Sequence, residues 1–177
     1  MKIYQFILFG LISLALFSCK LDGVSESTPG FYLVKIMHIA GNDTTHLNFQ
    51  GNTLDTISVG DTITFQSVVY SQYNKLLQYN ITSSREKSVE FLWGEKEHLD
   101  SIFTSSSDYD KGLFVMDGTF SELYFPFKYV AKEAEKDLKL TFSVLNDASS
   151  NYNSTTVTIV TPIKEAVQEE NTTEPEI

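Results

Sequence analysis

The fold is decided by residues 138–145, LKLTFSVL, where apolar and polar residues alternate strictly. Every second residue from Leu138 to Val144 is apolar, and Lys139, Thr141 and Ser143 stand between them. Successive side chains of a β-strand point to opposite faces. The segment therefore predicts a strand with one buried and one exposed face.

The same period of two recurs along the chain, in residues 62–69, 77–82, 89–93, 122–129 and 156–161. Pairs of Gly, Asn, Asp and Ser separate these runs and predict turns. An earlier run, Phe31–Ile39, is apolar on both faces apart from Lys35 and His38, as expected of a central strand or one that contacts two layers. The pattern predicts an all-β, antiparallel β-sandwich. One short helix is expected near residues 129–136, where two Ala and several charged residues fit one or two turns.

Several segments resemble bacterial immunoglobulin-like modules of the polycystic-kidney-disease type. Residues 58–65, SVGDTITF, are similar to the entry to strand B, and residues 138–160 are similar to the last two paired strands. Residues 91–94, FLWG, are similar to the strand with the core Trp, and Trp93 is in phase with the apolar residues before it. The resemblance implies an immunoglobulin-like sandwich over residues 30–162.

The beginning of the chain predicts export. Lys2 precedes an apolar run, Ile7–Phe17, that is too short for a comfortable membrane span. Residues 16–19, LFSC, then resemble the lipobox of bacterial lipoproteins. The resemblance implies a signal peptide over residues 1–18, removed after Ser18, and lipidation of Cys19 by acyl chains such as palmitate. Anchored by these chains, the protein is expected at the outer membrane of a Bacteroidota-type cell envelope, with the surface and periplasmic faces both open.

Two polar segments flank the expected domain. Residues 19–29 predict a lipidated N-terminus followed by a tether, and residues 163–177 predict an acidic, disordered tail.

The composition excludes several classes of protein. The chain has 13 Lys and Arg against 23 Asp and Glu, a formal charge of −10, which argues against nucleic-acid binding. Its single Cys excludes an internal disulfide framework and a Cys-rich zinc site. The three His, His38, His46 and His98, lack the spacing of metal ligands, and no nucleophile or phosphate-loop motif is present. Residues 108–112, DYDKG, lack the calcium-loop spacing and predict an ordinary turn. We therefore expect no enzyme activity, no cofactor and no bound metal.

The remaining signals concern binding and modification. Tyr109 and Tyr124 are candidates for stacking against a sugar ring, because Tyr offers a flat apolar face with a polar tip. Residues 95–120, the longest irregular stretch, are where function is first sought. Four Asp-Thr or Asp-Ser steps resemble the O-glycosylation signal of secreted Bacteroidota proteins, and the resemblance implies modification at Thr44, Thr56, Thr62 and Ser101.

The sequence thus predicts a non-catalytic, lipid-anchored envelope protein that acts as a binding or assembly module. Its partner at the envelope is a glycan or a protein. Two alternatives stay open, a glycan-capture accessory of a polysaccharide-uptake system and a subunit of a surface fimbrial complex.

Overall fold

The computed structural model describes residues 26–149 and 151–166. In chain order its elements are β1 (Gly30–Ala40), β2 (Asp43–His46), β3 (Phe49–Gln50), β4 (Thr53–Leu54), β5 (Ile57–Ser58), β6 (Thr62–Tyr70), β7 (Leu76–Ser83), the 3₁₀ turn η1 (Glu86–Ser88), β8 (Val89–Leu92), α2 (Lys96–Ile102), η2 (Tyr109–Lys111), β9 (Leu113–Val115), β10 (Glu122–Ala131), β11 (Lys139–Asn146), β12 (Ser154–Val160) and β13 (Ile163–Lys164).

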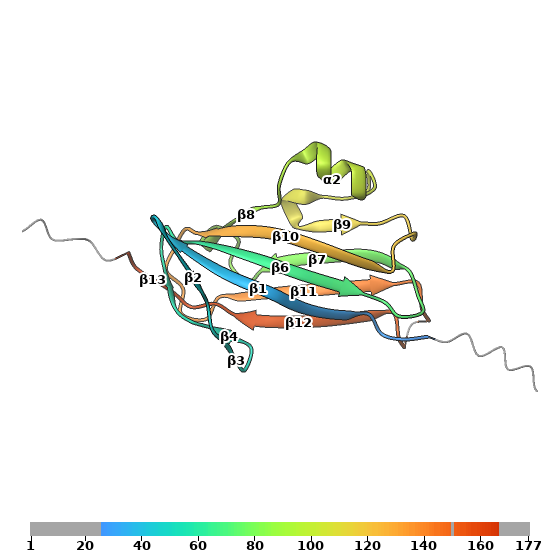
Figure 1. Ribbon diagram of the computed structural model, residues 1–177, viewed down its shortest axis with the longest axis horizontal. Coiled ribbons are helices and arrows are strands. Elements are labelled where there is room, and N and C mark those ends of the chain that lie inside the picture. The colour runs from blue at the N-terminus through green and yellow to red at the C-terminus, as the bar shows by residue number, and fades with distance from the viewer. Residues whose placement is uncertain (1–25, 150, 167–177) are drawn as a thin grey trace, which may run out of the picture.

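Two sheets packed face to face make up the molecule (Figure 1). Over the described residues, the first sheet is five-stranded with the order β2-β1-β6-β10-β8, and the second is six-stranded with the order β3-β4-β12-β11-β7-β9. The long strands all pair antiparallel. The prediction of an all-β antiparallel sandwich is confirmed. Strands β1, β6, β10 and β8 take the places of A, B, E and D of an immunoglobulin constant-type domain, and β7, β11 and β12 take those of C, F and G.

The core lies between the sheets and is built by the alternation seen in the sequence. Along β10 and β11, every second side chain is buried. Phe65 of β6 stacks on Phe127 of β10 with ring centroids 5.0 Å apart, and meets Phe142 of the second sheet edge-on at 6.3 Å. Offset and edge-on ring pairs of this kind add to the free energy of burial.

A bulge in strand β1 changes which of its residues face the core. The register of β1 against β6 shifts between Leu33 and Lys35. Phe31 packs against the core before the bulge, and Ile36 does so after it. A bulge adds one unpaired residue, so the side chains that face inward switch from odd to even positions. This switch explains why the run is apolar on both faces, and it turns Tyr32 outward.

The helix expected near residues 129–136 is absent, and that prediction is wrong. Tyr129 and Ala131 are buried residues of β10, paired with β8, and a loop follows them. Burial and pairing of Tyr129 and Ala131 in β10 outweigh the helix propensity of Ala, which differs from that of most other residues by less than about 1 kcal/mol. The helix that the structure contains, α2, lies at Lys96–Ile102, inside the stretch expected to be irregular.

The strand expected to carry the core Trp is also placed differently. The C position is taken by β7, with a fully buried Tyr79, whereas Trp93 follows the edge strand β8. Trp93 still packs against the core as expected, stacked on Phe91 at 4.6 Å, and its indole N–H donates to the Tyr109 carbonyl at 2.8 Å.

The folded part extends beyond both expected boundaries. Ile163 is buried in the core, and β13 pairs with β5 past the expected end at residue 162. On the N-terminal side, Pro29 is buried, and the side-chain amide of Asn146 donates to the Ser27 carbonyl at 2.9 Å. The carboxylate of Glu26 accepts hydrogen bonds from Ser149. The chain is therefore fixed to the sandwich from Glu26 onward, and the rest of the expected tether and tail lies outside the described residues.

Two glycines have a left-handed backbone, but only one of them is also closely packed, so substitutions at the two positions can be compared. Gly41 and Gly112 have φ values of 58° and 63°, but a Cβ on Gly41 would meet open space, whereas one on Gly112 would lie 2.0 Å from the Ile81 carbonyl oxygen. Gly41→Ala should lower the free energy of unfolding by about 1–2 kcal/mol. Gly112→Ala should lower it by roughly 2 kcal/mol more, because the backbone must also move. Urea unfolding measures both, and equal losses would contradict the close approach of Gly112 to β7.

Candidate functional site: the outer face of the first sheet

Three exposed tyrosines share the outer face of the first sheet. Tyr32 of β1 and Tyr124 of β10 lie on either side of Val68 in β6, and both are paired with it in register. Tyr70 lies two residues further along β6, and its ring meets that of Tyr32 edge-on at 5.9 Å. Tyr32, Tyr70 and Tyr124 are 48%, 43% and 52% exposed, whereas Val68 between them is 5% exposed. We call Tyr32, Val68, Tyr70 and Tyr124 the tyrosine face.

The position of the Tyr70 ring depends on a glycine. A Cβ built on Gly30, the register partner of Tyr70, would lie 2.3 Å from atoms of that ring. The ring therefore lies across the backbone of β1, and a side chain at residue 30 would displace it. Covering a strand glycine with an aromatic ring from the neighbouring strand is a known way to pack such a position.

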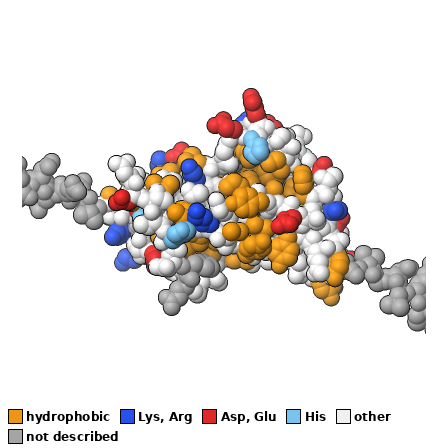
Figure 2. All heavy atoms as spheres, viewed as in Figure 1, with side chains coloured by type: hydrophobic (Ala, Val, Ile, Leu, Met, Phe, Trp, Pro, Cys, Tyr) orange, Lys and Arg blue, Asp and Glu red, His pale blue; other side chains and the backbone are white. Residues whose placement is uncertain are grey.

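A groove continues the tyrosine face toward the helix. It has a volume of about 410 Å³ and lies between α2 and strands β8 and β10, with Leu92, Ile102, Tyr124 and Pro126 among the residues that line it. Its polar lining includes His98 and Lys128. Tyr124 belongs to both surfaces, so the tyrosine face and this groove form one continuous, mainly apolar surface. Figure 2 shows this face, on which hydrophobic side chains gather in the middle of the view.

Polar groups border the rings. Glu122 pairs in register with Tyr70, and Gln66 and Thr64 continue the outer row of β6. Lys128 lies at the far end of the outer row of β10. Flat apolar rings with carboxylate, amide and ammonium groups at their margin can stack on the apolar face of a sugar and hydrogen-bond its hydroxyls.

The structure separates the two tyrosines that the sequence proposes for stacking. Tyr124 lies on the tyrosine face. Tyr109 lies in η2, outside that face, half-buried against Phe114, with its hydroxyl donating to a carboxylate oxygen of Asp100 at 2.9 Å. Burial, the hydrogen bond to Asp100 and the charge of Asp100 together raise the pKa of Tyr109 to about 12. Tyr109 thus holds the loop that follows α2 against the sandwich.

Tyr32 and Tyr70 complete the face, and the sequence did not single them out as a pair. Tyr32 falls in the run that is apolar on both faces, and the parity switch that exposes it follows from a bulge. The alternation along β6 predicts that Tyr70 faces outward. Its neighbours across the sheet depend on strand order, which one sequence does not reveal.

Residues 108–112 form the 3₁₀ turn η2 and its two capping residues, Asp108 and Gly112. Asp108 caps η2 by accepting from the Lys111 backbone N–H, and the Lys111 ammonium lies 2.6 Å from its other carboxylate oxygen. The hydrogen bond from Lys111 lowers the pKa of Asp108. Across residues 26–149 and 151–166, no three His, Cys, Asp or Glu side chains are grouped to hold a metal ion.

The expected modification sites differ in exposure. Thr44 in β2 and Thr56 before β5 are exposed, whereas Thr62, paired with Ile39 and Val130, is half-buried. Ser101 is exposed on α2, and its hydroxyl donates to a backbone carbonyl one turn earlier. O-glycosylation at these four residues stays a prediction. Cys19 lies outside the described residues, and so does its expected lipidation.

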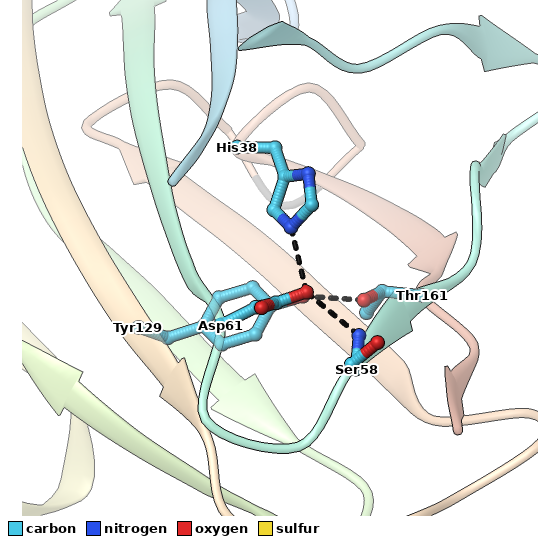
Figure 3. Close-up of polar contacts among 5 residues, drawn as sticks. All are labelled: His38, Ser58, Asp61, Tyr129 and Thr161. Carbon is cyan, nitrogen blue, oxygen red and sulfur yellow. Dashed lines mark hydrogen bonds and ion pairs between the residues drawn. The ribbon is translucent and has the colours of Figure 1, made fainter. Parts of the chain in front are cut away.

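A polar cluster at the opposite end of the sandwich supports the fold (Figure 3). Nε2 of His38 lies 2.6 Å from a carboxylate oxygen of Asp61, which also accepts the Ser58 backbone N–H at 2.8 Å. Nearby, the hydroxyls of Tyr129 and Thr161 share a hydrogen bond. Burial raises the pKa of Tyr129 well above its usual value, the hydrogen bond to Thr161 lowers it, and the charge of Asp61 raises it further. These contacts tie β1, the turn before β6, β10 and the end of β12 together.

Comparison with protein-family models finds no matching family, and comparison with curated proteins finds no matching relative. Among the described residues, none of the helices has the length and apolar character needed to cross a membrane. The site is therefore interpreted from its own geometry.

The partial burial of Tyr109 and its hydrogen bond to Asp100 predict a late tyrosine titration. The phenol of Tyr109 should ionise near pH 12, and Asp100→Asn should move this step toward the ordinary value of about 10. Because folding raises the pKa of the Tyr109 phenol, this phenol contributes fully to the free energy of unfolding below about pH 10. The contribution is lost as the pH rises through 12. Ultraviolet difference absorbance follows the titration, with Tyr109→Phe as the control that identifies the step. A spectrum in which Tyr109→Phe removes an ordinary, early step would contradict the contact.

Proposed function

We propose that the chain is a non-catalytic, lipid-anchored binding module of the bacterial envelope and that it captures a glycan on the tyrosine face. One observation carries this proposal. Three half-exposed tyrosine rings from three neighbouring strands form one surface, around a residue that they keep almost dry. Neighbouring strands lie about 4.8 Å apart, so Tyr32 and Tyr124 are separated by roughly 10 Å, enough for more than one sugar ring.

The surrounding charges favour a glycan over a lipid surface. Aromatic residues also sit at membrane interfaces, where their rings contact the headgroups. At the Tyr70 end of the tyrosine face, however, Glu122, Glu26 and Asp147 outnumber Lys75, and Lys128 lies at the far end of the outer row of β10. Carboxylates are repelled by anionic lipid, but they accept hydrogen bonds from sugar hydroxyls.

The tether supports a position close to the membrane. The expected anchor, Cys19, is separated from Glu26 by six residues, which reach at most about 25 Å. The end of the sandwich at which β1 begins is thus held near the bilayer, with the tyrosine face running along its side.

Binding should depend on each ring of the face. The full chain, purified in detergent, is titrated calorimetrically with a panel of soluble polysaccharides. Tyr32→Ala and Tyr124→Ala should each weaken binding by about 5- to 10-fold, because a stacked ring contributes about 1 kcal/mol to the binding free energy. Tyr152→Ala removes an equally exposed ring from the β11–β12 loop, which joins two strands of the second sheet rather than the first, and should leave the affinity unchanged.

Three results would contradict the proposal. The first is no binding to any polysaccharide of the panel, and the second is binding that survives both substitutions. The third is association with vesicles of phosphatidylglycerol and phosphatidylcholine that is lost in Tyr124→Ala, which would make the face a membrane-contact surface.

Gly30→Ala offers an independent test, because it moves a ring without removing it. The added methyl group should push the Tyr70 ring off β1, and binding should fall about as much as in Tyr70→Ala. The melting temperature should change little, since the ring is at the surface and free to swing outward. Full affinity in Gly30→Ala would show that the position of the Tyr70 ring is irrelevant to binding.

A further inference from the structure

The two sheets leave an open seam between β1 and β12. On one side β12 pairs with β11 along its whole length. On its other side, within the described part of the chain, the register holds a single pair, Val160 with Thr53 of the short strand β4. Strand β1 is flanked by β2 only over Met37–Ala40, so its first half is also uncovered on that side. Strands β1 and β12 therefore each have an edge that is only partly covered by a short strand, and these edges lie side by side (Figure 1).

The free edge of β12 presents its backbone in a known direction. The Val160 N–H donates to the Asn52 carbonyl at 2.8 Å, on the side away from β11. Backbone groups of alternate residues in a strand point the same way. The N–H and C=O of Thr158 and Thr156 therefore face the seam, where no described strand pairs with them.

A groove lies behind this edge. It has a volume of about 540 Å³, and its lining includes the apolar side chains of Leu33, Val34, Leu47, Val157 and Ile159. Besides Tyr32, which also belongs to the tyrosine face, Lys35 and His46 are the titratable side chains of the lining, which contains no carboxylate. This groove thus offers an extended peptide basic groups and no carboxylate, in a chain with a formal charge of −10.

The sequence of β12 lacks the usual protection of a free edge. Natural edge strands are blunted by charged residues, Pro or bulges, because an unprotected edge pairs with other chains. Residues 154–160, STTVTIV, hold no charge and no Pro, and their register with β11 is regular. Such an edge can pair with a strand of another chain.

We propose that the seam accepts an extended strand from a partner polypeptide. The strand hydrogen-bonds to Thr156 and Thr158 and places alternate apolar side chains in the groove, as in other strand-addition complexes. An acidic side chain of the partner lies near Lys35 and His46, where the charge is complementary.

Other occupants fit the seam less well. The tail of this chain, residues 167–177, VQEENTTEPEI, has acidic residues but lacks alternating apolar ones and contains a Pro. A second copy would pair its β12 antiparallel with the first, and the two tether ends would then point in opposite directions. Two copies anchored in one membrane, as the proposed function requires, cannot be joined in that way.

The probe is a set of synthetic nine-residue peptides offered to the full chain in detergent. One peptide alternates Val and Thr with one central Asp, the second replaces this Asp by Lys, and the third has the first composition with the alternation scrambled. The Asp peptide should bind at least 10-fold more tightly than the Lys peptide, and the scrambled peptide should not bind. Bound Asp peptide should slow hydrogen exchange at the Thr156 and Thr158 amides, which are the groups that it pairs with.

Thr158→Pro removes one of these N–H groups on the free edge, where Pro is tolerated. It should abolish peptide binding while Tyr124→Ala leaves it intact, so the seam and the tyrosine face are tested separately. If Thr158→Pro does not fold, the exchange data on the unsubstituted chain decide. The proposal is overturned if none of the peptides binds, if binding leaves the two amides unprotected, or if a dimer of the chain alone protects them.

Discussion

The register of β6 is the constraint on which the rest of this structure depends. β6 is paired on both sides, with β1 and with β10. Its inward row, centred on Phe65, must meet rings of both sheets, since Phe65 stacks on Phe127 and meets Phe142. With that row fixed, period two sends Val68 and Tyr70 to the outer face. A slip of one residue would bury the tyrosine and expose the phenylalanine.

Strand β1 links the core to both candidate surfaces. Its bulge lets Phe31 enter the core while Tyr32 faces outward, so one irregularity contributes a ring to each side of the sheet. The edge of β1 away from β6 borders the seam with β12. The tyrosine face and the groove at the seam meet at Tyr32, which belongs to both, whereas Tyr124 belongs to the tyrosine face and not to the lining of that groove.

The sequence predicted what depends on local period and missed what depends on strand placement. Alternation at residues 138–145 and 122–129 was enough for the strands, the buried row and the outward direction of Tyr124. The helix expected near 129–136 failed because pairing with β8 outweighs helix propensity, and α2, with seven residues and only Leu99 and Ile102 apolar, is too short to show a clear helical period. The outward direction of Tyr32 was not predicted, because the bulge that reverses the inward and outward positions of β1 has no distinctive residue in the sequence. No sequence pattern predicts that the free edge of β12 lies beside that of β1, because this depends on both sheets together.

The central claim is that the outer face of the first sheet receives the ligand. The most direct measurement is the aromatic NMR spectrum of the chain during titration with a polysaccharide that it binds. The account predicts that the ring signals of Tyr32, Tyr70 and Tyr124 shift together and saturate at one concentration, while those of Tyr109 stay in place. Shifts confined to Tyr109 and the loop after α2, with the three rings of the face unmoved, would contradict it.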